Sequence, residues 1–320
     1  MNAGELEIKW KSIVFGGAAQ YRSLRISADS FPELYLALDV KGNRYLILQV
    51  PDKTAVDCST IEKENLSLEW FEEKRFILIG LRSIRFLDLF NDLTLSLYNR
   101  IKDIQSPEHY SREFIHVFHK WAEFFEDGSS GLLPESDLKG LFGELIVLRW
   151  YLANDQQLSV NQILDAWQGP FNRAQDFIFP ALNLEVKTKN TDEMNIRISS
   201  EFQLEEEPGK GLNLVIVNLN KQEDGLTLRA LIADIRELIM LKAGDLSVFM
   251  KLLARAGVKA ADPEKYDEFI WEISNLSFYN CTDLQFPRIT TSTIMDGISQ
   301  VGYRLNMRVL ETFLINKFTP

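Results

Sequence analysis

The 320-residue sequence contains only two cysteines and three histidines. Cys58 and Cys281 cannot build a disulfide framework in a chain of this length, so we expect a reducing, cytoplasmic compartment. The histidines, His109, His116 and His119, all fall in one predicted helix and have no cysteine beside them. They lie opposite an apolar stripe of that helix, so we interpret them as a solvated face and not as a zinc site.

Long apolar runs are missing too. No run approaches the roughly 18–20 residues of a membrane span, and the N-terminus has no hydrophobic signal region, so we expect no membrane partner. Positive charge is scarce, because 35 Lys and Arg stand against 46 Asp and Glu, which gives a net charge of -11. This balance argues against a protein that binds nucleic acid mainly through its own charge. The argument is weaker where a divalent metal neutralises an acidic site.

The composition is otherwise that of a globular protein, with 46% hydrophobic and 25% charged residues. A chain of this length suits two or three modules. We expect three of them: a mainly-β N-terminal module over 1–105, a central module with a leading helix over 106–225, and a mixed helical and strand region over 226–320.

Local patterns predict the main elements of the two flanking regions. In the first, two β-hairpins and a helix are expected, at 31–38 with 44–50, 66–70 with 75–79, and 85–100. Ser106 caps a second helix, whose apolar stripe consists of Phe114, Phe118, Trp121 and Phe125. The Gly- and Ser-rich segment 127–131 is the clearest break. After 226, a helical pattern precedes two strand-like runs, at 231–255, 269–279 and 303–313.

The central module predicts an α+β fold. A helix capped by Asp137 and ending near Ala153 is followed by three strands, a short helix and a buried strand, at 175–179, 184–188, 195–199, 200–204 and 212–217. This αβββαβ order is the core of restriction-endonuclease-like proteins. The expected architecture is therefore that core, flanked by the mainly-β module and the mixed C-terminal region.

Three charged side chains come together on the predicted hairpin of 175–188. Strand alternation places Glu185 and Lys187 on one face, and a tight turn at 180–183 places Asp176 opposite Glu185. Two carboxylates in this position form an oxygen-rich site for Mg²⁺. The Lys187 ammonium then orients an attacking water, and the metal stabilises charge that develops on a phosphate. The pattern therefore indicates metal-dependent hydrolysis of a phosphodiester.

Acid-x-Lys triplets also occur elsewhere, for example at Glu72 and Lys74, but only the 185–187 triplet has a second acid across a turn. In the strongest competitor, Glu33 precedes Asp39 and Lys41, yet both acids lie on one strand about 20 Å apart. Geometry therefore rejects it.

Glu144 lies in the middle of the predicted helix 137–153, whose faces are almost all apolar. A buried carboxylate is costly unless it is paired or bound to a metal, so we expect Glu144 at the same metal site. Gly140 and Gly143 lower the helix propensity beside it, which suggests close approach to another part of the backbone.

These segments resemble the bacterial PD-(D/E)xK motif protein family, whose members are encoded near restriction and phage-defence genes. The resemblance rests on GLFGEL at 140–145, QDF at 175–177, LEVKT at 184–188 and the run 196–204, and extends weakly over most of the chain, including 286–289. It implies a restriction-endonuclease-like fold that cleaves foreign DNA. It also implies catalytic roles for Glu144, Asp176, Glu185 and Lys187, and an accessory role for Gln203. One departure is Gln175, which replaces the proline of the motif.

The function expected is that of a Mg²⁺-dependent DNA endonuclease of a bacterial restriction or phage-defence system, with Mn²⁺ able to substitute. Asp176, Glu185 and Glu144 are the expected metal ligands. Other defence subunits are expected partners, and a homodimer would supply the two sites needed to cut both strands. The acidic charge leaves an alternative open, a catalytically silent nuclease-fold subunit that serves as a scaffold or DNA sensor. RNA as the substrate is not separated from DNA by any motif.

Overall fold

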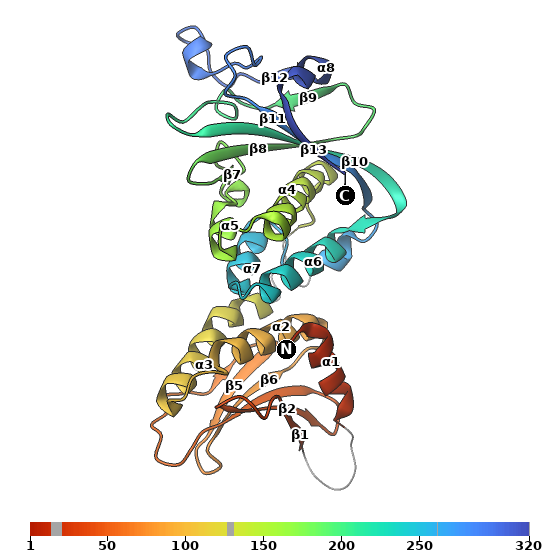
Figure 1. Cartoon of the computed structure of the whole chain (residues 1–320). Helices are drawn as coiled ribbons and strands as arrows, with labels where there is room; N and C mark the ends of the chain where they lie inside the picture. The colour runs from red at the N-terminus through yellow and green to blue at the C-terminus, as the bar shows by residue number, and fades with distance from the viewer. Residues whose placement is uncertain (14–20, 127–130, 261, 320) are drawn as a thin grey trace. The chain divides into compact units, whose positions relative to one another are not determined.

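The computed structural model describes residues 1–13, 21–126, 131–260 and 262–319. The chain forms two compact units (Figure 1). The first comprises 1–130 with the short segments 245–250 and 259–261, and the second comprises 131–244, 251–258 and 262–320. Of the break expected at 127–131, residues 127–130 lie outside the described residues.

The first unit is built on an antiparallel sheet in the order β1-β2-β3-β6-β5-β4. Its strands are β1 (Tyr21–Arg25), β2 (Glu33–Asp39), β3 (Arg44–Gln49), β4 (Ile61–Glu62), β5 (Leu66–Phe71) and β6 (Phe76–Leu81). Both predicted hairpins are confirmed, as β2–β3 and β5–β6. Three helices accompany the sheet: α1 (Ala3–Ser12), α2 (Leu87–Ile101) and α3 (Pro107–Ala122).

Helix α3 confirms the interpretation of its sequence. The Ser106 side chain caps it by accepting the backbone N–H of His109. The apolar stripe Phe114, Phe118, Trp121 and Phe125 is buried, and all three histidines are exposed. Helix α1 was not predicted from the pattern. It has a capping box between Asn2 and Glu5 and buries only Leu6 and Trp10.

The second unit contains a five-stranded sheet in the order β13-β11-β10-β8-β7. Its strands are β7 (Phe177–Ile178), β8 (Leu182–Lys189), β10 (Gly211–Thr227), β11 (Ile270–Asn280) and β13 (Leu314–Phe318). Only the β8–β10 pair is parallel. On one face lie α4 (Glu135–Asn154) and α6 (Leu228–Leu241), with α5 (Val160–Ala166) beside α4, and α7 (Leu246–Arg255) follows α6 (Figure 1).

A two-stranded sheet of β9 (Asn195–Ile198) and β12 (Tyr303–Asn306), followed by α8 (Met307–Leu310), lies on the opposite face of the main sheet (Figure 1). The two layers share one buried cluster, in which Ile196 and Ile198 of β9 pack with Leu214 and Ile216 of β10. The protein is therefore a mixed α+β structure with several sheets. None of the helices within the described ranges is long and apolar enough to cross a membrane.

The predicted core differs from this structure in its third strand and its second helix. The third strand, β9, pairs with β12 and not with the main sheet, and its alternating apolar residues bury one face. The segment 200–204 forms turns, with the N–H of Gln203 bonded to the carbonyl of Ser200 in a three-residue step that does not continue as a helix. In chain order the predicted first helix and four strands are present as α4, β7, β8, β9 and β10, and the short helix predicted at 200–204 is not.

Several predicted boundaries also move. Helix α4 starts at Glu135 after Pro134, so Asp137 lies in its first turn and is not the cap. The helical pattern 231–255 is two helices, because Ala243 between them adopts a positive φ of 55°. The run 303–313 contains β12, α8 and a short 3₁₀ turn before β13 begins.

The expected module boundaries can be located in this fold. The boundary at 105/106 falls between α2 and α3, which pack together in the first unit. The boundary at 225/226 falls inside β10, whose end pairs with β11. Residues on both sides of 225/226 therefore build one sheet.

Candidate active site

The register between β7 and β8 determines how the two acids of the predicted site, Asp176 and Glu185, lie relative to each other. Phe177 pairs with Leu184, and Ile178 pairs with Asn183. Continuing this register by one residue places Asp176 opposite Glu185, as the sequence predicts. Because β7 has only two residues, it leaves the edge of β8 free beyond Leu184. The Asp176 side chain occupies that edge, where its Oδ2 atom accepts the N–H of Val186 at 2.7 Å.

Glu185 and Lys187 lie on one face of β8, again as predicted. The Lys187 Nζ atom donates to Glu185 Oε1 at 2.5 Å. Glu185 is only 1% exposed, whereas the Lys187 side chain is 18% exposed and reaches solvent. The second oxygen of Glu185, Oε2, is buried and has no hydrogen-bond partner within the described residues. A buried carboxylate oxygen without a donor is costly, and such atoms are typical of sites that bind an ion, a water or a substrate.

Helix α4 brings Glu144 to this edge by packing closely on β8. A Cβ atom at Gly143 would lie 2.1 Å from Cγ2 of Thr188, so only glycine permits this approach. The interpretation of Gly143 as a point of close approach is therefore correct, but the approach is to side chains of β8, Thr188 and Val186, and not to backbone. For Gly140 it is wrong, because a Cβ atom there would meet nothing within 4 Å.

Two residues that the sequence did not indicate hold the Glu144 carboxylate. The indole N–H of Trp167 donates to Glu144 Oε2 at 2.7 Å. A Cβ atom at Gly169 would lie 2.0 Å from the same oxygen, so the turn after α5 fits around it. The N–H groups of Gln168 and Gly169 donate to the carbonyl of Asp176 at 2.7 and 3.1 Å. This turn therefore fixes Glu144 and Asp176 together.

The carboxylates influence one another electrostatically. Loss of solvent contact, and then the charge of Asp176, raise the pKa of Glu144 to about 8. The same two causes raise the pKa of Glu185 well above its ordinary value, and Lys187 opposes part of that shift. Burial also raises the pKa of Asp176, against the Val186 N–H and the charge of Lys187. Such mutual shifts are typical of carboxylates that share a metal or a proton.

Within the described ranges, no three His, Cys, Asp or Glu side chains are gathered as a ready-made metal ligand set. Here Asp176 and Glu144 each accept a protein N–H, and Glu185 accepts the Lys187 ammonium. The residues nevertheless fit Mg²⁺, which is commonly bound by one or two carboxylates together with waters and substrate phosphates. Of these carboxylates, Glu185 keeps one buried oxygen, Oε2, without a hydrogen-bond partner in the described residues.

Gln203 and Gln175 have structural contacts near this site. Gln203 Oε1 accepts the N–H of Ser199 at 2.7 Å and so closes the turn of 200–204. Gln175 is 8% exposed, and its Nε2 atom donates to the carbonyl of Phe202 at 3.0 Å. The residue that replaces the motif proline therefore anchors this turn beside Asp176.

A sequence model of the family described as "Putative PD-(D/E)XK family member" (DUF4420) matches residues 5–308. The chain belongs to this family. No curated protein and no solved structure is significantly similar to it. In this PD-(D/E)XK family member, Glu144, Asp176, Glu185 and Lys187 lie together at one edge of the sheet, whereas the Gln203 side chain bonds to the backbone of Ser199 and its carbonyl accepts from Gln175.

Proposed function

We propose that the protein is a Mg²⁺-dependent DNA endonuclease, with Mn²⁺ able to replace Mg²⁺. The observation that carries this proposal is the partnerless Oε2 atom of Glu185, which is buried beside Lys187 and opposite Asp176. Membership of the PD-(D/E)XK family supports a nuclease-like fold for the same residues.

In this proposal Asp176 and Glu185 bind the metal, and Glu144 binds it directly or holds one of its waters. Bound metal activates a water and offsets the charge that develops on the phosphate. Lys187 orients the attacking water, since its ammonium is fixed by Glu185 and still reaches solvent. Trp167 and the turn at Gly169 keep Glu144 in place. Gln203 has an accessory role, because it closes the turn that Gln175 anchors beside Asp176.

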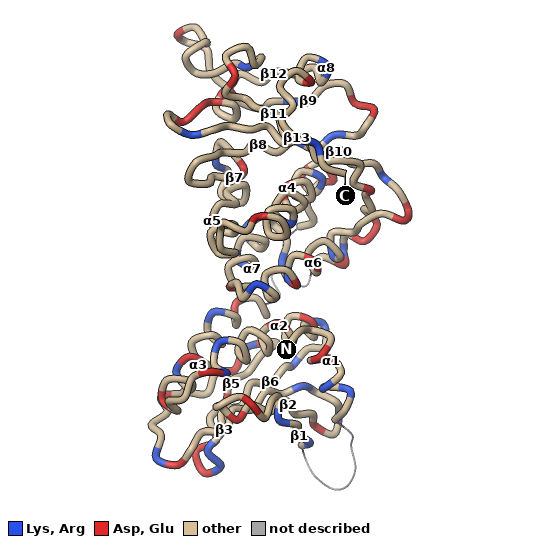
Figure 2. The backbone as a smooth tube through the Cα atoms, in the orientation of Figure 1, with Lys and Arg blue, Asp and Glu red and all other residues tan. Residues whose placement is uncertain are grey.

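Lys and Arg are interspersed with Asp and Glu along both units in the part of the chain that is drawn (Figure 2). With a net charge of -11, binding then depends on the metal, on a few placed cations and on partners. We therefore propose that the protein acts with other subunits of a bacterial defence system, and as a homodimer where both strands are cut.

The test is cleavage of plasmid DNA by purified protein with Mg²⁺ or Mn²⁺. Glu185→Gln and Lys187→Ala should each lower the cleavage rate at least about a hundredfold, because each removes a group that acts on the reacting atoms. Lys74→Ala is the matched control, since Lys74 belongs to an exposed acid-x-Lys triplet in a turn of the first unit. Cleavage that persists in both site variants would contradict the proposal.

The second candidate function is a catalytically silent nuclease-fold subunit that senses or scaffolds DNA. The absence of a gathered three-residue ligand set among the described residues favours it. Calorimetry with Mn²⁺ separates the two candidates. One or two metal ions bound to the parent protein and lost in Glu185→Gln support the nuclease, and no measurable binding supports the silent subunit.

A further inference from the structure

Two arginines lie opposite each other on the outer side of the small sheet formed by β9 and β12. In the antiparallel register Arg197 pairs with Arg304, and the neighbouring Ile196 pairs with Leu305. The isoleucine and the leucine are buried, whereas both arginines are exposed. Because side chains alternate along a strand, both guanidinium groups belong to the face that points away from the main sheet.

This arrangement is unfavourable unless an anion offsets it. The Cβ atoms of directly opposed residues lie about 4.5–5.5 Å apart, and like charges in that position destabilise a sheet. Neither strand contains an acidic residue, and neither arginine side chain has an ion pair or a hydrogen bond with the described residues. The acid that precedes β9 most closely, Glu193, accepts a hydrogen bond from Asn190 at 2.7 Å. In a chain with a net charge of -11, these arginines therefore have no counter-ion of their own.

Other hydrogen-bond donors surround the two arginines. Asn195 pairs with Asn306 on the same side of the sheet, and both are exposed. Asn306 Oδ1 accepts the N–H of Arg308 at 2.9 Å, and Arg308, in α8, is exposed as well. The outer side of this sheet and the start of α8 thus offer guanidinium and amide groups and no carboxylate. Such a surface suits the oxygens of a phosphate.

The small sheet lies on the side of the main sheet to which Glu185 and Lys187 project. Leu214 of β10 pairs with Glu185 of β8, so both side chains project to one face, and Leu214 belongs to the buried cluster that β9 and β12 cover. Strand β9 also contacts β8 (Figure 1). Packed sheets lie about 10 Å apart, so the outward-facing arginines are on the order of 10 Å or more from Lys187. A DNA strand, at about 3.4 Å per nucleotide, spans that distance with roughly three or more nucleotides.

We propose that Arg197 and Arg304 together bind one backbone phosphate of the nucleic acid, several nucleotides away from the scissile phosphate. The inference rests on the proposed function, because the candidate active site on the same side of the sheet is what makes nucleic acid the expected ligand. The planar, permanently charged guanidinium group matches phosphate oxygens. A bound phosphate offsets the repulsion between the two arginines. This pair is therefore one of the placed cations through which an acidic chain holds DNA.

The test measures binding of a labelled DNA duplex by fluorescence anisotropy in a Lys187→Ala background, so that the DNA is not cut. Arg197→Gln combined with Arg304→Gln should weaken binding roughly tenfold. It should also reduce the slope of log affinity against log salt concentration by about 0.9, the change for one lost phosphate contact. Duplexes of unrelated sequence should lose affinity equally, because phosphate contacts read no bases. Arg112→Gln combined with Lys74→Gln removes the same charge from exposed sites of the first unit, and should leave affinity and slope nearly unchanged.

A charge reversal separates a phosphate site from a structural role. Arg304→Glu turns the like-charge pair with Arg197 into an opposite-charge pair, so the fold should be at least as stable in urea as the parent. DNA binding should nevertheless fall at least as far as in the double glutamine variant. A less stable Arg304→Glu protein would assign the arginines a structural role and overturn the inference.

Three further outcomes would also overturn it: unchanged affinity and salt slope in the double glutamine variant, an equal loss in the control pair, and a loss that depends on the DNA sequence. The proposed nuclease stands in each of these cases. If the parent does not bind DNA at low salt, the inference fails too, and plasmid cleavage by the parent then decides the proposed function separately.

Discussion

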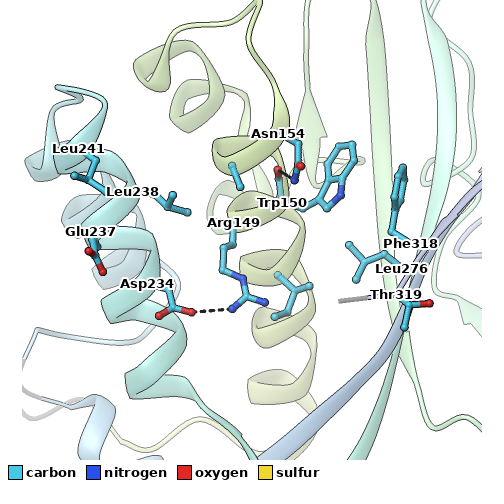
Figure 3. A pocket seen from close by; sticks show the side chains of 12 residues that line it. Arg149, Trp150, Asn154, Asp234, Glu237, Leu238, Leu241, Leu276, Phe318 and Thr319 are labelled. Carbon is cyan, nitrogen blue, oxygen red and sulfur yellow. Dashed lines mark hydrogen bonds and ion pairs between the residues drawn. The ribbon is translucent and has the colours of Figure 1, made fainter.

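The two edges of the five-stranded sheet in the second unit differ in their chemistry. At the β13 edge, a pocket of about 540 Å³ lies between α4, α6 and the last two strands (Figure 3). Its lining is largely apolar, with Trp150 packed against Phe318 at a ring distance of 4.9 Å. Its arginine, Arg149, is already paired with Asp234 at 2.8 Å. The β7 edge instead holds carboxylates and a lysine, with one buried oxygen unpartnered.

This contrast teaches that the size of a hollow does not identify the reactive site. An apolar pocket whose arginine is already paired can bind a molecule through apolar contacts. Carboxylates forced together without enough donors are unstable by themselves, and they persist where a function requires them. The same helix, α4, contributes to both edges, with Glu144 beside Asp176 and Trp150 in the pocket at the β13 edge.

The largest expected effect is on how the free energy of unfolding depends on pH. In the folded protein the pKa of Glu144 rises from 4.5 to about 8, and that of Glu185 is raised too. The folded state therefore binds more protons than the unfolded state between these values. The contribution of these groups to stability is full below pH 4.5 and is lost as pH rises through about 8, which is on the order of a few kcal/mol for metal-free protein.

Chemical unfolding at several pH values checks this prediction. Glu144→Gln should flatten the decline, since the amide cannot ionise. Mn²⁺ should restore stability at pH 8, because a metal binds the ionised carboxylates of the folded state. If the stability of the metal-free protein increases from pH 5 to pH 8, the prediction is contradicted, and the carboxylates at the β7 edge are not destabilised by their burial.

Local pattern predicts part of this site well. Strand alternation and a short turn brought Asp176 opposite Glu185, and the apolar helix indicated Glu144, because each of these relations spans few residues or one element. Trp167 lies 23 residues from Glu144 and meets it only through tertiary packing. No periodicity in the sequence reports such a contact.

The same limit explains the errors in the fold. Alternation in 195–198 correctly predicts a strand with one buried face, but it does not name the partner, β12, about a hundred residues later in the chain. The segment 200–204 has helix-forming residues, yet Gln203 bonds to the backbone of Ser199 and favours a turn. The pairing of β9 with β12 and the turn at 200–204 could therefore be established only from the structure.

An effect of intermediate size on the free energy of unfolding is expected from substitution of two glycines of α4. One glycine packs against β8 and the other lies in open surroundings. Gly143→Ala should destabilise the fold by about 1–3 kcal/mol, because the added methyl group collides with Thr188 on β8. Gly140→Ala should stabilise it by about 0.5–1 kcal/mol, because its surroundings are open and alanine favours helices. Urea unfolding measures both. If both alanines stabilise the protein, α4 does not pack on β8 as tightly as described.

The smallest expected effect is on the Mn²⁺ requirement and the pH profile of cleavage. It is tested by comparing substitutions of two tryptophans, Trp167 and Trp150, one at each edge of the sheet. Trp167→Phe keeps an aromatic ring but makes the buried side chain smaller, and it removes the N–H that Glu144 accepts. Because that hydrogen bond favours the charged carboxylate, its loss should raise the pKa of Glu144 further. Metal-dependent cleavage should then need roughly tenfold more Mn²⁺, and its pH profile should shift to the alkaline side.

Trp150→Phe is the matched substitution, since Trp150 lines the apolar pocket and packs on Phe278 and Phe318. It should leave both the Mn²⁺ requirement and the pH profile unchanged, even where it costs some stability. A purely structural role for Trp167 would lower activity without moving the pH profile, and both tryptophan variants would then behave alike. A shift confined to Trp167→Phe would show that the indole acts through the proton affinity of Glu144, and that the two edges differ in chemistry and not only in shape.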